Sequence, residues 1–136
     1  MGSWPAWEHR LATWEELSSD SLRAAKLLAS QGHLRSSVSR AYYAAYCAIA
    51  GAAAARGVSF PHGWNNPSHE QLTHIVAAHL LLPRWTRRRM ISRVRLLRRA
   101  REDADYRPNS SISPEVGRVC LQIASSILKT LERAHD

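Results

Sequence analysis

Apolar residues recur along the chain at the three- and four-residue spacing of amphipathic helices, and no convincing stretch alternates with the period of a strand. Start and stop signals divide this pattern into about five helices. The predicted helices cover residues of about 14–30, 34–56, 68–82, 83–106 and 114 onward. The pattern therefore predicts an all-α fold, an up-and-down bundle of about five helices. We expect a single domain over residues 1–136 with its core at about 14–133.

Residue types that cap helices stand at these predicted ends. Ser or Thr followed three residues later by Glu or Gln forms a capping box, and Gly after the last periodic residue ends a helix. Pro fits the first turn, where its missing N–H has no partner to lose. The residues in these positions are Thr13 with Glu16, Ser68 with Gln71, Gly32, Gly57, Pro83, Ser113 and Pro114.

The second predicted helix has almost no polar face, because residues 41–55 are apolar or small nearly all round. Such a helix is normally covered on several sides, so we expect it at the centre of the bundle. Tyr42, Tyr43 and Tyr46 add bulky rings to it, and each hydroxyl needs a hydrogen-bond partner where it is buried.

Positive charge is concentrated in the fourth predicted helix. Seventeen of the 19 basic residues are arginines, and nine of them lie between positions 84 and 101 without an intervening acid. Guanidinium groups pair well with phosphate and carboxylate, so we expect RNA, DNA or an acidic protein face as the partner. An arginine-rich composition on a solvated helix face is the alternative. The candidate nucleic-acid contacts are Arg84, Arg87, Arg88, Arg95, Arg98 and Arg99.

One arginine of this helix falls on its apolar stripe. The stripe consists of Met90, Val94, Leu97, Arg101 and Ala104. An unpaired buried guanidinium is costly, so Arg101 must meet an acid, a partner chain or a ligand. Its neighbours Asp105 and Tyr106 complete a candidate site, which we expect to lie near Tyr42 and Tyr46. A local ladder of ion pairs is the plainer alternative.

These segments resemble the HEPN domain family, in its small stand-alone branch. The resemblance rests on Ser-Arg-Ala-Tyr-Tyr-Ala-Ala-Tyr at 39–46 and Arg-Glu-Asp-Ala-Asp-Tyr at 101–106, and it covers about residues 14–133. It implies a helical bundle that forms homodimers. Many members act with a minimal nucleotidyltransferase as a toxin–antitoxin pair, and active members are metal-independent endoribonucleases with an Arg-x(4–6)-His signature.

The resemblance assigns roles to residues of this chain. Arg101 matches the signature arginine, but the residue five positions later is Tyr106, and the next histidine is His135. Arg101, Asp105 and Tyr106 are the implied catalytic candidates. In some family toxins a tyrosine near the signature is adenylylated by the partner enzyme, which points to Tyr106. The residues implied to line the dimer groove are Arg40, Tyr42, Tyr43 and Tyr46.

Two functions from different classes follow. The first is a toxin–antitoxin component that binds RNA, its nucleotidyltransferase partner or both, with or without ribonuclease activity. The second is a non-catalytic module whose dimer groove holds a nucleotide or a partner protein. DNA binding by the cationic helix is less favoured, because no helix-turn-helix spacing is evident.

The remaining histidines have plainer interpretations. Arg56 and His62 form a second Arg-x5-His match, but it straddles a predicted helix end, outside the family's position for the signature. We expect His62, Trp64 and His69 to pack or cap the loop that follows the second helix, with the rim of a pocket as the alternative.

We expect a cytoplasmic protein without a metal, a cofactor or a membrane segment. Cys47 and Cys120 fit buried free thiols, and no CxxC, HExxH or Cys/His cluster is present. Residues 1–10 lack the basic start and apolar stretch of a signal peptide. The longest run of small residues, 44–55, is too short and too rich in alanine to span a bilayer.

Overall fold

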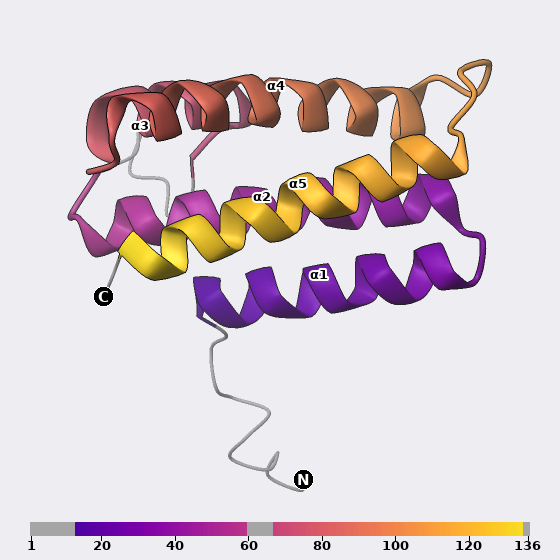
Figure 1. Ribbon diagram of the computed structural model, residues 1–136, viewed down its shortest axis with the longest axis horizontal. Coiled ribbons are helices and arrows are strands. Elements are labelled where there is room, and N and C mark those ends of the chain that lie inside the picture. The colour runs from indigo at the N-terminus through magenta and orange to yellow at the C-terminus, as the bar shows by residue number, and fades with distance from the viewer. Residues whose placement is uncertain (1–12, 60–66, 135–136) are drawn as a thin grey trace, which may run out of the picture.

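The bundle is seen in the computed structural model, which describes residues 13–59 and 67–134 (Figure 1). Within these ranges the elements are α1 (Trp14–Ser30), α2 (Leu34–Ala55), the 3-10 helix η3 (His69–Gln71), α3 (Leu72–His79), α4 (Arg84–Tyr106) and α5 (Pro114–Ala134). The same ranges contain no strand. The long helices run alternately in opposite directions, which confirms the predicted all-α up-and-down bundle.

Most of the predicted caps lie where the helices begin and end. The Thr13 hydroxyl oxygen accepts a hydrogen bond from the Glu16 N–H at 3.0 Å. Ser68 and Gln71 form a reciprocal capping box ahead of α3. The chain turns after α1 and α2 at two glycines in the left-handed region, Gly32 at φ +81° and Gly57 at φ +73°.

Helix α3 is shorter than predicted, and that prediction was wrong by three residues. The helix ends at His79 instead of Leu82, and Leu80 has an extended backbone with ψ 133°. Pro83 disfavours the helical conformation of the residue before it, so the chain leaves the helix and restarts at Arg84.

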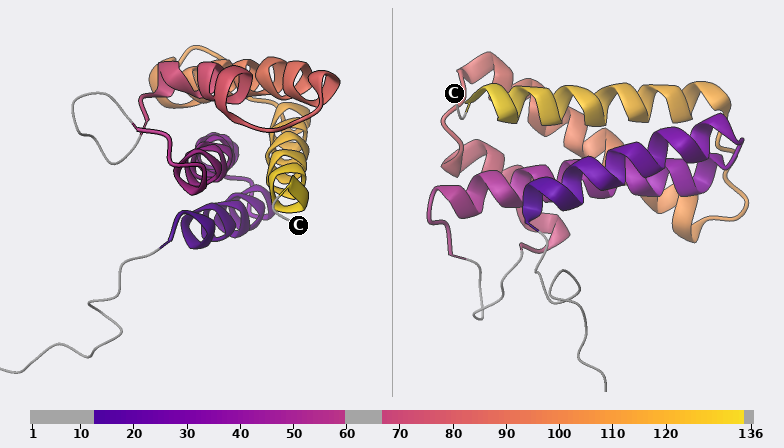
Figure 2. Two further views of the ribbon diagram at one scale, coloured as in Figure 1. Left: turned by 90° about the vertical axis from the view of Figure 1, so that its left-hand side faces the viewer. Right: turned by 90° about the horizontal axis from the view of Figure 1, so that it is seen from below.

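Helix α2 lies at the centre of the bundle, as predicted, with α1, α4 and α5 around it (Figure 2). Its small residues let α1 pack closely. Ser18 Oγ donates to the Ala44 carbonyl at 3.0 Å, and Ser37 Oγ donates to the Ala25 carbonyl at 2.7 Å. These buried serines satisfy their hydroxyl groups on the neighbouring helix, and so they tie α1 to α2.

The two cysteines are buried free thiols, as predicted. Burial raises the pKa of both, and that of Cys120 to about 11. Within the described ranges, no helix combines the length and the apolarity that crossing a membrane requires.

Helix α5 packs on one side of α2 and α4, and the segment that enters α3 lies on the other side (Figure 2). The seam between α4 and α2 is therefore covered by α5 on one side, and on the other side it faces η3 and α3. Arg101 and its neighbours lie on the side of η3.

Candidate functional site

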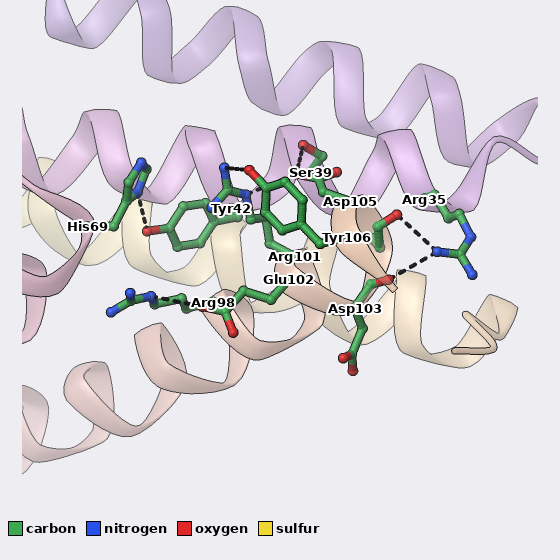
Figure 3. Close-up of polar contacts among 11 residues, drawn as sticks. Arg35, Ser39, Tyr42, His69, Arg98, Arg101, Glu102, Asp103, Asp105 and Tyr106 are labelled. Atoms are coloured by element: carbon green, nitrogen blue, oxygen red, sulfur yellow. Dashed lines mark hydrogen bonds and ion pairs between the residues drawn. The ribbon is translucent and has the colours of Figure 1, made fainter. Parts of the chain in front are cut away.

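The structure places Arg101 at the seam between α4 and α2, the position expected from its spacing (Figure 3). Its side chain is 21% exposed. The guanidinium carbon lies 5.5 Å from the centre of the Tyr42 ring and 5.2 Å from that of Tyr106. Cation–π attraction to both rings restricts the guanidinium to one orientation.

Asp105 fixes one edge of this guanidinium. Arg101 Nε donates to Asp105 Oδ2 at 2.9 Å, and Ser39 Oγ of α2 donates to the same oxygen at 3.1 Å. Arg101 Nη2 donates to the Tyr106 hydroxyl at 3.2 Å. Nη1 donates to no group among the described residues, so that part of the guanidinium can receive an anion.

Other charges surround the pair. Arg98 lies 3.3 Å from Glu102 one turn along α4. The guanidinium of Arg40, on α2, lies 5.1 Å from the centre of the Tyr43 ring. Arg40 therefore belongs with Tyr43, and beside Tyr42 the two cations Arg98 and Arg101 are each paired with a carboxylate, Glu102 and Asp105.

The predicted groove residues of α2 divide into two groups. Tyr42 contacts Arg101 directly, whereas Tyr46 lies one turn farther along and donates its hydroxyl to the Pro67 carbonyl. Tyr43 stacks on Tyr46 at 5.9 Å between ring centres and carries Arg40 on its ring. The expected cluster of Tyr42, Arg101 and Asp105 is therefore present. Tyr46 lies one helical turn away and contacts Pro67.

A histidine from another element reaches this cluster. His69, the first residue of η3, has Nδ1 at 2.7 Å from the Tyr42 hydroxyl (Figure 3). Its ring also packs at 5.0 Å from that of Tyr46. From the sequence we expected His69 to pack or cap its loop, with the rim of a pocket as the alternative, and no sequence signal connects it with Arg101. The other residues of that expectation, His62 and Trp64, lie outside the described residues.

Burial determines the protonation of this pair. It lowers the pKa of His69, and the positive charges of Arg101 and Arg98 lower it further. Burial also raises the pKa of Tyr42 to about 12. At neutral pH the site therefore holds a neutral imidazole and a protonated phenol, which share one hydrogen bond whose donor depends on the histidine tautomer.

Arg35 holds the end of the helix that carries Arg101. It stands in the first turn of α2, and its guanidinium donates to backbone carbonyls at the end of α4 and beyond (Figure 3). A cation there satisfies carbonyls that have no partner within the helix, and it complements the negative end of the helix dipole. The five acceptors are the carbonyls of Asp103, Ala104, Arg107, Pro108 and Ser110.

The arginines of α4 that we predicted to contact nucleic acid lie on one side of the helix. Arg87 donates to the Ala77 carbonyl of α3 at 3.3 Å, and three- and four-residue spacing puts Arg84, Arg95 and Arg98 on the same side. Arg99 is exposed on the outer surface. Arg88 also borders a groove between α4 and α5. Helical spacing puts Arg88 and Arg99 beside Arg84 and Arg95, so the six predicted nucleic-acid contacts share the side of α4 that faces away from its buried residues.

The comparisons with known proteins agree with this architecture. A family model described as HEPN domain matches residues 12–134, nearly the whole chain. No curated protein matches the chain.

Proposed function

Because the chain belongs to the HEPN domain family, we propose that it is a toxin–antitoxin component that binds a phosphate of RNA at Arg101. One observation carries the proposal: Arg101 donates from Nε to Asp105 and from Nη2 to the Tyr106 hydroxyl, while Nη1 donates to none of the described residues. A guanidinium fixed in this way is oriented for an anion before the anion arrives, so little entropy is lost on binding.

Two partners belong to this proposal, a second copy of the chain and a minimal nucleotidyltransferase. Tyr106 supports the second partner, because its side chain is 66% exposed while its hydroxyl stays beside the Arg101 guanidinium. Attack of that hydroxyl on the α-phosphate of ATP would release pyrophosphate and leave AMP on Tyr106. The new phosphate would then compete with RNA for Arg101.

RNA cleavage at this site requires a group that accepts the proton of the ribose 2′-hydroxyl. His69 is the candidate, because it is neutral and meets the same tyrosine, Tyr42, as Arg101 does. In the tautomer with hydrogen on Nδ1, that atom donates to Tyr42 and Nε2 is free to act as the base. Attack on phosphorus would give a 2′,3′-cyclic phosphate, and the departing 5′-oxygen would take a proton from water.

The experiment incubates the full chain with single-stranded RNA and EDTA, and measures both binding and cleavage. The variants are Arg101→Ala and His69→Gln, and the control is Arg118→Ala, which removes an equal charge from an exposed ion pair on α5. Cleavage that resists EDTA and is lost in the first two variants supports the ribonuclease. If the wild-type chain binds no RNA, the proposal fails.

The second candidate function, a non-catalytic module, has its own result in the same experiment. RNA that is bound but stays intact, with an affinity that falls in Arg101→Ala and with added salt, supports the module. The seam geometry favours it equally, because Arg101 is arranged to hold an anion whether or not a proton is moved.

Adenylylation is tested separately by the intact mass of the protein after co-expression with the neighbouring gene. We expect a mass increase of one AMP, absent from Tyr106→Phe. An unmodified wild-type chain beside an active nucleotidyltransferase contradicts this part of the proposal.

A further inference from the structure

Two hollows adjoin on the face of the molecule formed by α4, α5 and α1. The first, of about 570 Å³, lies between α4 and α5. The second, of about 470 Å³, runs along α5 toward α1. Ser126 and Thr130 line both, so the two hollows adjoin across α5, and we name them together the α5 groove. Since α5 packs on the side of α4 away from η3 and α3, the groove is separate from the Arg101 site (Figure 2).

Among the described residues, the charged side chains that line the α5 groove are all cations. Helices α4, α5 and α1 all contribute, and the groove includes both lysines of the chain. No acid stands among the described residues that line either hollow. The six cations are Arg88, Arg89, Arg93, Lys129, Arg133 and Lys26.

These cations also have no acidic partner elsewhere in the described residues. The salt bridges there use other arginines, such as Arg23 with Asp20 and Arg118 with Glu115. In the groove, Arg93 donates to the Ser126 hydroxyl at 3.4 Å, which leaves its charge uncompensated. Six like charges in one groove repel one another, so an extended anion that neutralises several of them would bind favourably.

An exposed tryptophan stands at the α4 end of the groove. Trp85 lines the first hollow and is 81% exposed. A ring beside spaced cations matches single-stranded nucleic acid, because bases stack on aromatic side chains while the backbone follows positive charge. An acidic protein surface would use the cations and leave the ring without a specific partner.

We infer that the α5 groove binds single-stranded RNA, with the phosphates along the cations of α4, α5 and α1 and a base stacked on Trp85. The inference rests on the proposed RNA-directed function. It adds a second contact on another side of α4, so that this helix meets RNA both at Arg101 and along α5.

The experiment measures the affinity of a fluorescently labelled oligouridylate for the full chain over a range of salt concentrations. The test variant is Lys129→Ala with Arg133→Ala, both exposed residues of the groove. The matched control is Arg23→Ala with Arg118→Ala, which removes the same charge from α1 and α5 outside the lining. Each lost phosphate contact lowers the slope of log affinity against log salt by about 0.7, so we expect a decrease of about 1.4 in the test variant alone.

A second pair of variants tests the stacked base. We expect Trp85→Ala to weaken oligouridylate binding by between about fivefold and a hundredfold, and Trp85→Phe to retain most of the affinity because it keeps a ring. Polyglutamate serves as the competing acidic ligand. Binding of polyglutamate as tight as that of RNA, with neither affected by Trp85→Ala, would overturn the inference in favour of an acidic protein partner.

Failure of the groove and failure of the Arg101 site give different results. Suppose that the Lys129→Ala, Arg133→Ala protein and the Trp85→Ala protein bind RNA like the control pair, while Arg101→Ala loses binding. The groove inference is then wrong and the proposed function stands. If the wild-type chain binds no RNA at any salt concentration, both are wrong.

Discussion

Replacing Arg35 by alanine tests how the fold positions the site. The guanidinium joins the first turn of α2 to five carbonyls at the end of α4. That last turn also carries Asp105 and Tyr106, which contact Arg101. The substitution should therefore lower the stability of the fold and loosen the site together.

The expected loss in the free energy of unfolding depends on how far each of the five hydrogen bonds is exposed to water. Three of them, to Asp103, Ala104 and Ser110, are partly buried, whereas the carbonyls of Arg107 and Pro108 can turn to water. A hydrogen bond to a charged group contributes roughly 1.5–3 kcal/mol, and bonds that share one guanidinium are not additive. With about 0.3–1 kcal/mol from the helix dipole, we expect a loss of about 2–4 kcal/mol.

The free energy of unfolding is measured by urea denaturation followed by far-ultraviolet circular dichroism. In a thermal melt the same loss lowers the melting temperature by roughly 6–20 °C in a chain of this length. Arg35→Lys should recover a part, because an ammonium cannot span the carbonyls that the planar guanidinium reaches. Arg23→Ala, which breaks an exposed pair, should cost less than about 1 kcal/mol. An Arg35→Ala protein within about 0.5 kcal/mol of the wild type would show that these bonds do not hold α4 to α2.

Three further predictions concern packing and protonation. Gly51→Ala should destabilise the bundle by about 1–3 kcal/mol in thermal unfolding, because the added Cβ would lie 2.8 Å from the Cβ of Trp14. Burial raises the pKa of Tyr42 to about 12, so this phenol loses its proton at lower pH in the unfolded chain than in the folded one. The free energy of unfolding should therefore fall between about pH 10 and 12, and less steeply in Tyr42→Phe. Cys47 and Cys120 should react slowly with a thiol reagent until urea is added, because burial raises the pKa of both thiols.

Local signals in the sequence were enough for the bundle. The capping residues Thr13 and Ser68 and the glycines that follow α1 and α2 mark helix boundaries through contacts within a few residues. The seam position of Arg101 was also predictable, because its spacing from Leu97 and Ala104 puts it on the inner side of α4. The end of α3 was predicted too late, because Pro83 was interpreted only as the start of the next helix. A proline also disfavours the helical conformation of the residue before it.

Contacts between distant segments could not be predicted in the same way. Arg35 resembles any other arginine of a first helical turn, and its carbonyl partners lie on another helix. His69 could not be linked to Tyr42, because their contact depends on how η3 docks on α2. The arginines between 84 and 101 suggested one cationic surface, whereas the packing of α5 and α3 on α4 separates them into different groups.

The most direct test of the central claim is the NMR signal of the Arg101 Nε–H group during addition of oligouridylate. This group donates to Asp105 at 2.9 Å, so its signal should be protected from exchange with water and should disappear in Arg101→Ala. We expect RNA to shift this signal and to leave that of Arg118 unchanged. A chain that binds RNA while the Arg101 signal stays in place would contradict this claim.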